Sequence, residues 1–437
     1  MTKKEQLIEE TYEILSGEDS DRACKAIPDD ACKNVPRNYV LNVLNGASTK
    51  LAEQLAGPKV VMPWLLSAIG APQFITGLLM PIKQAGSLIP QLIVSGQIRE
   101  YPIRKWFWVG AGVSQSIFLI LMIFAVLLFS PTLAGYAIVI LLLLFSTASG
   151  VGSVAYKDVV GKTIDKGIRG IMLANRAAIG GVLTIGAGLV IRFFIGEKGE
   201  TNNYLYLIGI AAVLWFLGAI FFAFKEEYAG ATEGGRNAIN EAKAGFQIFS
   251  KDGNYRTYLF AKIFLISIEI SAPFYVLHSK QVISGSIETL GIMIIAVGLA
   301  NIVSSPFWGK FADTSSKNTM IYAGLIGALT AIFALGFALL PSVIQTSYVY
   351  GIVFVLLGIA EAGVRLGRKT YLLDYLDEKD RPTYIAFANS SIGVVTLGIG
   401  ALLGLVIQYF GIQILLYVLI GMGLVGSYLS LRLKSSE

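Results

Sequence analysis

Long apolar stretches alternate with short polar ones along almost the whole chain. Each apolar stretch is long enough to cross the ~30 Å hydrocarbon core of a bilayer as an α-helix, which takes about 20 residues. The pattern therefore predicts an all-α membrane protein with twelve transmembrane helices, the last two meeting at Phe410–Gly411. The predicted segments are residues 39–69, 71–96, 106–130, 133–157, 170–195, 203–224, 257–279, 286–309, 319–340, 345–368, 383–410 and 411–432.

The longest polar stretch between two segments separates the first six helices from the last six. This division predicts two bundles that are joined by a linker and flanked by polar ends. The expected organisation is a cytoplasmic N-terminal arm (1–38), a first bundle (39–224), a cytoplasmic linker (225–256), a second bundle (257–432) and a cytoplasmic tail (433–437).

Composition supports a membrane protein over a soluble one. Hydrophobic residues make up 54% of the chain, charged residues only 15%, and the mean hydropathy is +0.65. The net charge of +6 could suggest a nucleic-acid partner. However, 26 of the 35 lysine and arginine residues lie in short polar segments on the side that holds both termini. The positive-inside rule then predicts cytoplasmic termini, a multi-pass protein of a bacterial inner membrane, and no nucleic-acid partner.

The two halves share a sequence repeat. Residues 157–188 align with residues 369–400 without a gap, and nine of the 32 positions are identical. Within them GVLTIGAG (181–188) matches GVVTLGIG (393–400). The offset spans six helices and preserves chain direction, so the repeat is parallel.

A second match follows the second helix of each half. SGQIREYPIRK (95–105) and WGKFADTSSKN (308–318) each carry a glycine, an acid four residues later and a base four residues after that. The two triplets are Gly96, Glu100 and Arg104 in the first half, and Gly309, Asp313 and Lys317 in the second.

On these loops and the repeat, residues 39–432 resemble the major facilitator superfamily, and GKFADTSSK is similar to its cytoplasmic loop signature. The resemblance implies two six-helix bundles around a central cavity, with rocker-switch alternating access. It also implies that Asp313, and in the first copy Glu100, latches the halves when the outer gate is open. The first copy departs from the pattern, since Glu100 replaces aspartate and Pro102 interrupts the loop. The alternative interpretation is that both loops are solvated turns.

Charged residues inside the apolar segments are the candidate site residues, because each costs several kcal/mol in the bilayer core unless it faces protein or water. Lys83 lies near the middle of GLLMPIKQAGSLIPQ (77–91), and Glu53 on the first helix is at similar depth. One hypothesis is an interior ion pair between them. The other is that Lys83 binds an anionic group of a substrate. Lys50 lies one helical turn before Glu53 and joins the same candidate set.

The second half offers three further candidates. Glu269 lies four residues before Pro273, and a carboxylate there could carry a coupling proton or serve as a structural partner. Glu361 and Arg365 are four residues apart, which favours an intrahelical pair over cavity lining. We expect a structural role for the charges toward helix ends, Arg176, Arg192 and Lys262, and the sequence assigns no role to Lys59, which follows Pro58.

Several function classes are excluded. VAYKDVVGKT ends in Gly-Lys-Thr but has Tyr156 where a phosphate-binding loop needs its first glycine, so no ATPase motor is expected. The chain has one histidine, His278, so catalytic and metal clusters that need several are excluded. We expect no enzyme activity, no metal and no cofactor.

The N-terminal arm holds both cysteines of the chain, Cys24 and Cys32. Seven residues separate them, which is not a usual zinc spacing. Reduced thiols are expected here. A redox- or metal-responsive lid over the cytoplasmic mouth is the alternative.

The sequence thus predicts a monomeric secondary transporter in the lipid bilayer, which moves a small organic and anionic solute, with H⁺ or Na⁺ as the coupling ion. A lipid or amphiphile exporter is an alternative, and a non-transporting membrane sensor on the same fold is another.

Overall fold

The computed structural model describes residues 3–18, 24, 27–165, 168–194, 201–230, 232, 246–283, 287–375 and 381–434. Over these residues the secondary structure is helical, with no strand. The predicted all-α fold class is therefore confirmed. Most of the predicted linker, 231 and 233–245, lies outside the described residues.

The helices of the first half begin with two short ones in the polar arm. The remaining seven are long or apolar, and α3 and α4 follow each other after a break. Their bounds are α1 (Lys3–Ser16), α2 (Asp29–Cys32), α3 (Val35–Leu55), α4 (Val61–Ala68), α5 (Gln73–Arg99), α6 (Lys105–Leu128), α7 (Pro131–Thr163), α8 (Arg169–Phe194) and α9 (Thr201–Ala223).

The second half repeats this order, with a broken helix first. Its helices are α11 (Gly253–Ile270), α12 (Ala272–Val282), α13 (Ile287–Thr314), α14 (Ser316–Phe337), α15 (Ser347–Tyr375) and α16 (Arg381–Leu431). The long α16 is interrupted at Gly411, whose φ of 82° and ψ of 173° are not helical. Glycine lacks a Cβ and tolerates this positive φ. The break lies where the sequence predicts the boundary between the last two segments.

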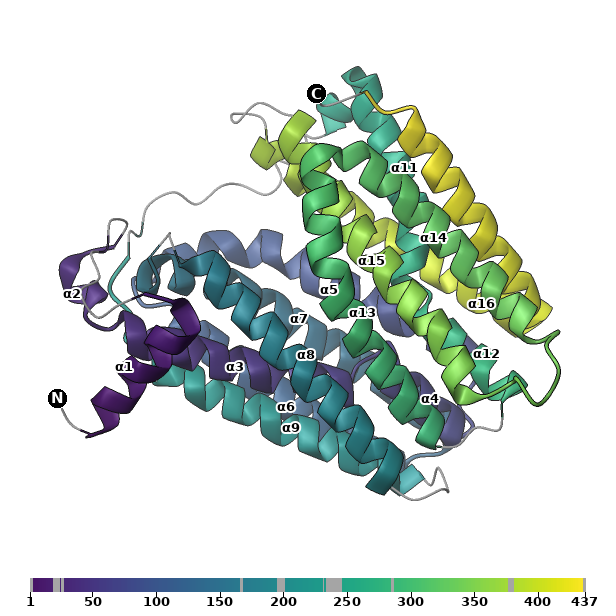
Figure 1. The fold of residues 1–437 in the computed structure, drawn as a ribbon, viewed down its shortest axis with the longest axis horizontal. Coiled ribbons are helices and arrows are strands. Elements are labelled where there is room, and N and C mark those ends of the chain that lie inside the picture. Colours follow the sequence, from purple (N-terminus) through teal and green to yellow (C-terminus); the bar gives the residue numbers. More distant parts are fainter. Residues whose placement is uncertain are drawn as a thin grey trace.

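Helices of each half pack mainly on one another: α3 contacts α8 and α9, and α7 contacts α5 and α6. In the second half α14 contacts α15 and α16, and α13 contacts α15. The most extensive contacts between the halves are those of α5 with α16 and of α8 with α13, and α12 also contacts α4 and α5. Figure 1 shows the two sets diverging as a V, with α4 and α12 toward the joined ends and both termini toward the separated ends.

Seven of the described helices are long and apolar enough to cross a membrane, and the bent pair of α11 and α12 would make eight. The helices α3 and α5, which carry charged residues, are not among these seven because they are less apolar. The chain is therefore a multi-pass membrane protein, while the count of twelve spans and the cytoplasmic side of the termini stay predictions.

The first membrane-crossing segment of each half is broken near a proline. The sequence GPK (57–59) separates α3 from α4, in agreement with the bend predicted at Pro58. A 42° bend separates α11 from α12 at Ser271, just before Pro273. Proline cannot donate a backbone hydrogen bond and displaces the preceding turn, so both breaks free polar groups near the candidate charges.

The N-terminal arm packs on the first half. Its helix α1 contacts α3 and α8, and α2 contacts α7. Tyr12 of α1 and Tyr39 of α3 are buried and meet edge to face with ring centroids 5.2 Å apart. Asn175 of α8 donates to the Tyr39 hydroxyl at 2.9 Å. The arm is thus attached to helix ends of one bundle.

The cysteines of the arm form a disulfide, Cys24–Cys32. The expectation of reduced thiols is therefore wrong for this structure. Spacing alone could not show the pairing, because it depends on α2 and the turn before it bringing the two Cα atoms to 5.8 Å. The bond closes a short loop beside the start of α3.

We predict that a Cys24→Ser/Cys32→Ser variant retains its bundles but loosens the arm. Loss of a short crosslinked loop should cost the arm about 2–3 kcal/mol, because the opened chain gains conformational entropy. Limited trypsin digestion should cut the variant faster before residue 35, and a reductant should do the same to the wild type. Equal cleavage rates for oxidised and reduced protein would contradict this role of the disulfide.

Candidate functional site

Lys83 and Glu53 meet where α5 faces α3. The Lys83 Nζ lies 3.9 Å from Glu53 Oε1, and the Lys50 Nζ lies 3.4 Å from Glu53 Oε2. The Lys83 and Glu53 side chains are each about 30% exposed, and Lys50 is 54% exposed. The predicted pairs are both present, and they leave one carboxylate shared by two ammonium groups that solvent can still reach.

An ion pair between the halves lies beside this cluster. The Lys59 ammonium, in the break between α3 and α4, contacts the carboxylate of Glu361 on α15. Glu361 is buried. The intrahelical pair expected between Glu361 and Arg365 is therefore wrong: Glu361 pairs with Lys59 and Arg365 is exposed. The unwound backbone at Pro58 allows Lys59 to leave its helix and reach across.

Glu269 lies in the last turn of α11, next to the break at Ser271. Its Oε2 accepts from the Arg368 guanidinium of α15 at 3.1 Å, whereas its buried Oε1 has no hydrogen-bond partner among the described residues. Lys262 lies about two turns before Glu269 on α11. It is buried and donates to Asn389 of α16 at 3.4 Å. The structural partner of Glu269 is thus Arg368, and half of the carboxylate remains unpaired.

Arg176 of α8 completes the charges of the first half. Its guanidinium lies over the Tyr156 ring, 4.5 Å from the centroid, and contacts the Tyr156 hydroxyl. The side chain crosses Gly46 of α3, where a Cβ would collide with it. Arg176 is therefore held by packing against glycine and tyrosine.

The balance of charge around these residues is positive. Three carboxylates, those of Glu53, Glu269 and Glu361, stand among more than twice as many cations. The cations are Lys50, Lys59, Lys83, Arg176, Lys262, Arg365 and Arg368. The three carboxylates pair with Lys50, Lys83, Lys59 and Arg368, and their three negative charges cannot neutralise the seven cations.

Cations also join the halves at the ends near α4 and α12. Arg192 of α8 forms an ion pair with Glu288 of α13 at 2.7 Å and lies over the Tyr348 ring of α15. Lys280 of α12 lies 4.4 Å from the centroid of the Trp64 ring of α4. These contacts cross between the halves and close this end, which the predicted topology makes the outer one.

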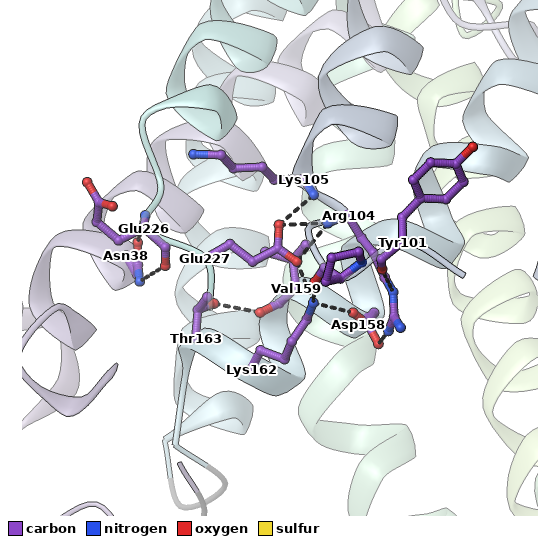
Figure 2. A network of polar contacts seen from close by, with 11 residues as sticks. Asn38, Tyr101, Arg104, Lys105, Asp158, Val159, Lys162, Thr163, Glu226 and Glu227 are labelled. Carbon is purple, nitrogen blue, oxygen red and sulfur yellow. Dashed lines mark hydrogen bonds and ion pairs between the residues drawn. The ribbon is translucent and has the colours of Figure 1, made fainter. Parts of the chain in front are cut away.

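At the opposite end, a buried carboxylate fixes three segments of the first half (Figure 2). Glu227, which follows α9, accepts from the backbone N–H groups of Arg104 and Lys105 and from the Lys162 ammonium at 2.5–2.9 Å. Asp158 of α7 pairs with Arg104 and with Lys162. The candidate gating residue Arg104 is thus buried in a network inside one bundle.

The other candidate gating residues have less defined surroundings. Glu100 caps the end of α5 and is exposed. Lys317 of α14 donates to the Leu433 carbonyl at 2.7 Å. Gly96 and Gly309 lie in α5 and α13, and the Asp313 side chain lies outside the described residues. The latch role of Asp313 and Glu100 therefore stays a prediction.

Metal chemistry has no candidate centre in the described part of the chain, where no group of three His, Cys, Asp or Glu side chains could hold an ion. The single histidine, His278, is buried and bonds through Nδ1 to the Tyr350 hydroxyl at 2.8 Å.

Broken apolar helices, paired interior charges and two joined helix sets are the features of a multi-pass membrane protein. Residues 257–436 match the family model described as Major Facilitator Superfamily. The match covers the helices from α11 onward, and over these residues the chain is similar to that superfamily.

Solved structures support the fold over nine-tenths of the chain. The nucleoside transporter NupG, as a D323A mutant, superposes with a TM-score of 0.71 at 13% identity, covering 90% of this chain and 99% of that one. A D-xylose–proton symporter gives 0.67 at 15% identity, covering 91% and 98%. The inward-open xylose transporter XylE from E. coli gives 0.63 at 14% identity, covering 91% and 96%.

Curated relatives add little about activity. An uncharacterized protein of Mycobacterium tuberculosis is 24% identical over 264 residues, which is 60% of this chain, and one of Mycobacterium bovis matches equally. The match spans about half the length (51%) of these relatives.

The pair between Lys59 and Glu361 generates a stability prediction. Lys59→Ala or Glu361→Gln alone should destabilise the purified protein by about 1–3 kcal/mol, because each leaves a partly buried charge or carboxyl unpaired. The double variant should cost less than the sum of the two, with a coupling of about 1 kcal/mol. Thermal unfolding of the four proteins measures this, and strictly additive shifts would show that the two side chains do not interact.

Proposed function

We propose that the protein is a secondary transporter that moves a small organic anion by alternating access between its two bundles. The observation that carries this proposal is the surplus of cations over carboxylates on α3, α5, α8, α11 and α15. A buried or half-buried cation without a counter-ion is costly in a membrane. An anionic substrate that enters between the bundles would supply the missing negative charge.

Glu53 shares its carboxylate between Lys50 and Lys83, so a substrate anion could compete with Glu53 for Lys83. Lys83 is 3.9 Å from Glu53, longer than a direct charge-assisted hydrogen bond of about 2.7–2.9 Å. Lys50 binds the other oxygen of the same group. A substrate carboxylate or phosphate could therefore take Lys83 while Glu53 keeps Lys50, so neither acid nor base is left unpaired.

The contacts at the α4 and α12 ends support an inward-facing arrangement. Arg192–Glu288 and Lys280–Trp64 hold the predicted outer side together, while the helix ends near both termini diverge (Figure 1). Under the predicted topology, the cation cluster would then be reached from the cytoplasm. Rocking of one bundle on the other would break the outer contacts and expose the cluster to the outside.

Glu269 is the residue we propose as the carrier of a coupling proton. It lies at a helix break, keeps one oxygen in the Arg368 pair and leaves the buried Oε1 without a partner. Protonation of such a carboxyl removes a charge that is only half compensated. A D-xylose–proton symporter has the same fold, which is compatible with proton coupling here.

A charge test separates substrate binding from structure at Lys83. We expect thermal unfolding of the wild-type protein to shift upward with small organic anions, phthalate and citrate among them, and not with matched neutral polyols. Lys83→Ala should lose the shift and Lys83→Arg should keep part of it, because arginine retains the charge. If Lys83→Ala still responds like wild type, Lys83 is not the anion ligand. If no anion shifts the wild type, the anion-transport proposal is wrong.

A second test concerns coupling. Glu269→Gln keeps the size of the side chain but cannot exchange a proton, so uphill uptake into proteoliposomes driven by a pH gradient should fall by at least tenfold. Exchange of labelled for unlabelled substrate should continue, since it needs no net proton movement. Glu226→Gln, which changes an exposed ion pair with Arg37 inside the first bundle, serves as the matched control. Gradient-driven uptake retained in Glu269→Gln would contradict the coupling role.

A further inference from the structure

A separate cavity lies inside the first bundle, away from the boundary between the halves. Its volume is about 180 Å³, and its walls come from α3, α6, α7, α8 and α9. It is bounded by Thr49, Lys50, Glu53, Trp108, Gln115, Ser149, Gly152, Ser153, Tyr156, Arg176 and Trp215. The pairs Lys50–Glu53 and Arg176–Tyr156 account for part of this lining, but they leave the polar groups at its inner end unexplained.

The cavity has a charged open end and an uncharged inner end. Lys50 is 54% and Glu53 30% exposed at this end, and Arg176 adds a second cation. The inner members are buried: Gln115 is 2% exposed, and Trp108 and Trp215 are 8% and 6% exposed. The open end therefore carries two cations against one carboxylate, and it joins the cluster of Lys83 and Glu53.

Gln115 is the group that points to a ligand. Its Nε2 is buried and has no hydrogen-bond partner among the described residues, although its neighbour Ser116 donates to the Ala212 carbonyl at 2.8 Å. An unpaired buried amide donor costs about 1–3 kcal/mol. An oxygen acceptor on a ligand would remove that cost, and it would have to reach past the two cations to do so.

The aromatic walls set the shape of the ligand. Trp108 is fixed by stacking on Phe222, with ring centroids 4.4 Å apart, and Trp215 meets Phe145 edge to face at 5.5 Å. Rings held in place in this way favour a flat, apolar-faced group between them. A volume of about 180 Å³ holds about six water-sized groups at roughly 30 Å³ each. That is one six-membered ring, and it is smaller than the about 300–1,000 Å³ of a complete ligand pocket.

We infer that this cavity is a substrate subsite for the ring of a monocyclic carboxylate. The carboxylate stays at the open end between Lys83 and Arg176 while Glu53 keeps Lys50, the ring enters between Trp108 and Trp215, and an oxygen on the far side of the ring accepts from Gln115 Nε2. The inference rests on the proposed transport of an organic anion and specifies which anion: a ring acid with a polar substituent opposite the acid, and not an open-chain one.

The test measures binding of three monoanions to purified protein by titration calorimetry: 4-hydroxybenzoate, benzoate and hexanoate. In the wild type, 4-hydroxybenzoate should bind about fivefold tighter than benzoate, the worth of one hydrogen bond of about 1 kcal/mol. Benzoate should in turn bind tighter than hexanoate. Gln115→Leu should make 4-hydroxybenzoate and benzoate equal. Gln408→Leu, the same change at an exposed position of α16, should leave all three affinities unaltered.

Each other outcome overturns the inference. If Gln115→Leu still distinguishes the hydroxyl, or if hexanoate binds as well as the ring acids, the cavity is not a ring subsite while anion transport still stands. If no monoanion binds the wild type but the anions of the Lys83 test do, the same conclusion follows. If neither set binds, the transport proposal fails too. Should Gln115→Leu not fold, Ser153→Leu fills the cavity from α7 and must abolish the preference for ring acids; a retained preference overturns the subsite.

Discussion

The fold depends on one constraint: a charge placed in the bilayer core must find a partner inside the protein. Lys59 satisfies this constraint because it lies in the helix break at Pro58, from which its side chain reaches Glu361 in the other half. Glu269 meets it at the break before Pro273, through Arg368. Breaks and charges therefore occur together, because a break lets a side chain reach a distant partner and the partner in turn fixes where the broken ends lie.

The same constraint connects the two ends of the molecule. Arg192 and Lys280 join the halves at the α4 and α12 ends, while Lys59 joins them nearer the middle. In contrast, Arg104, Asp158, Lys162 and Glu227 satisfy one another within the first bundle. A rocking motion would therefore have to exchange the contacts between halves but could leave the internal network intact, so that the first bundle moves as one body.

Local features of the site were predictable from the sequence, and distant pairings were not. Proline and glycine fix the breaks at Pro58 and Gly411, and a spacing of three residues puts Lys50 beside Glu53. The Lys59–Glu361 pair joins residues 302 positions apart. Nothing in the local pattern tells which of several interior cations Glu361 faces, since helix rotation is set by packing with neighbours. Gln115 was missed for a similar reason: a single amide on an apolar helix gains its meaning only from the four other helices around it.

The contacts of Glu227 determine where the linker between the bundles begins. Because Glu227 anchors the chain after α9, and the Gly230 N–H donates to the Pro102 carbonyl at 3.0 Å, the first bundle holds the chain up to residue 230 and not only to the end of the helix. Fifteen residues, 231–245, then lead to the segment before α11. At full extension, about 3.3–3.6 Å per residue, they reach about 50 Å. This length sets an upper bound on how far residues 230 and 246 can part, and each residue removed between them would shorten that reach by about 3.5 Å.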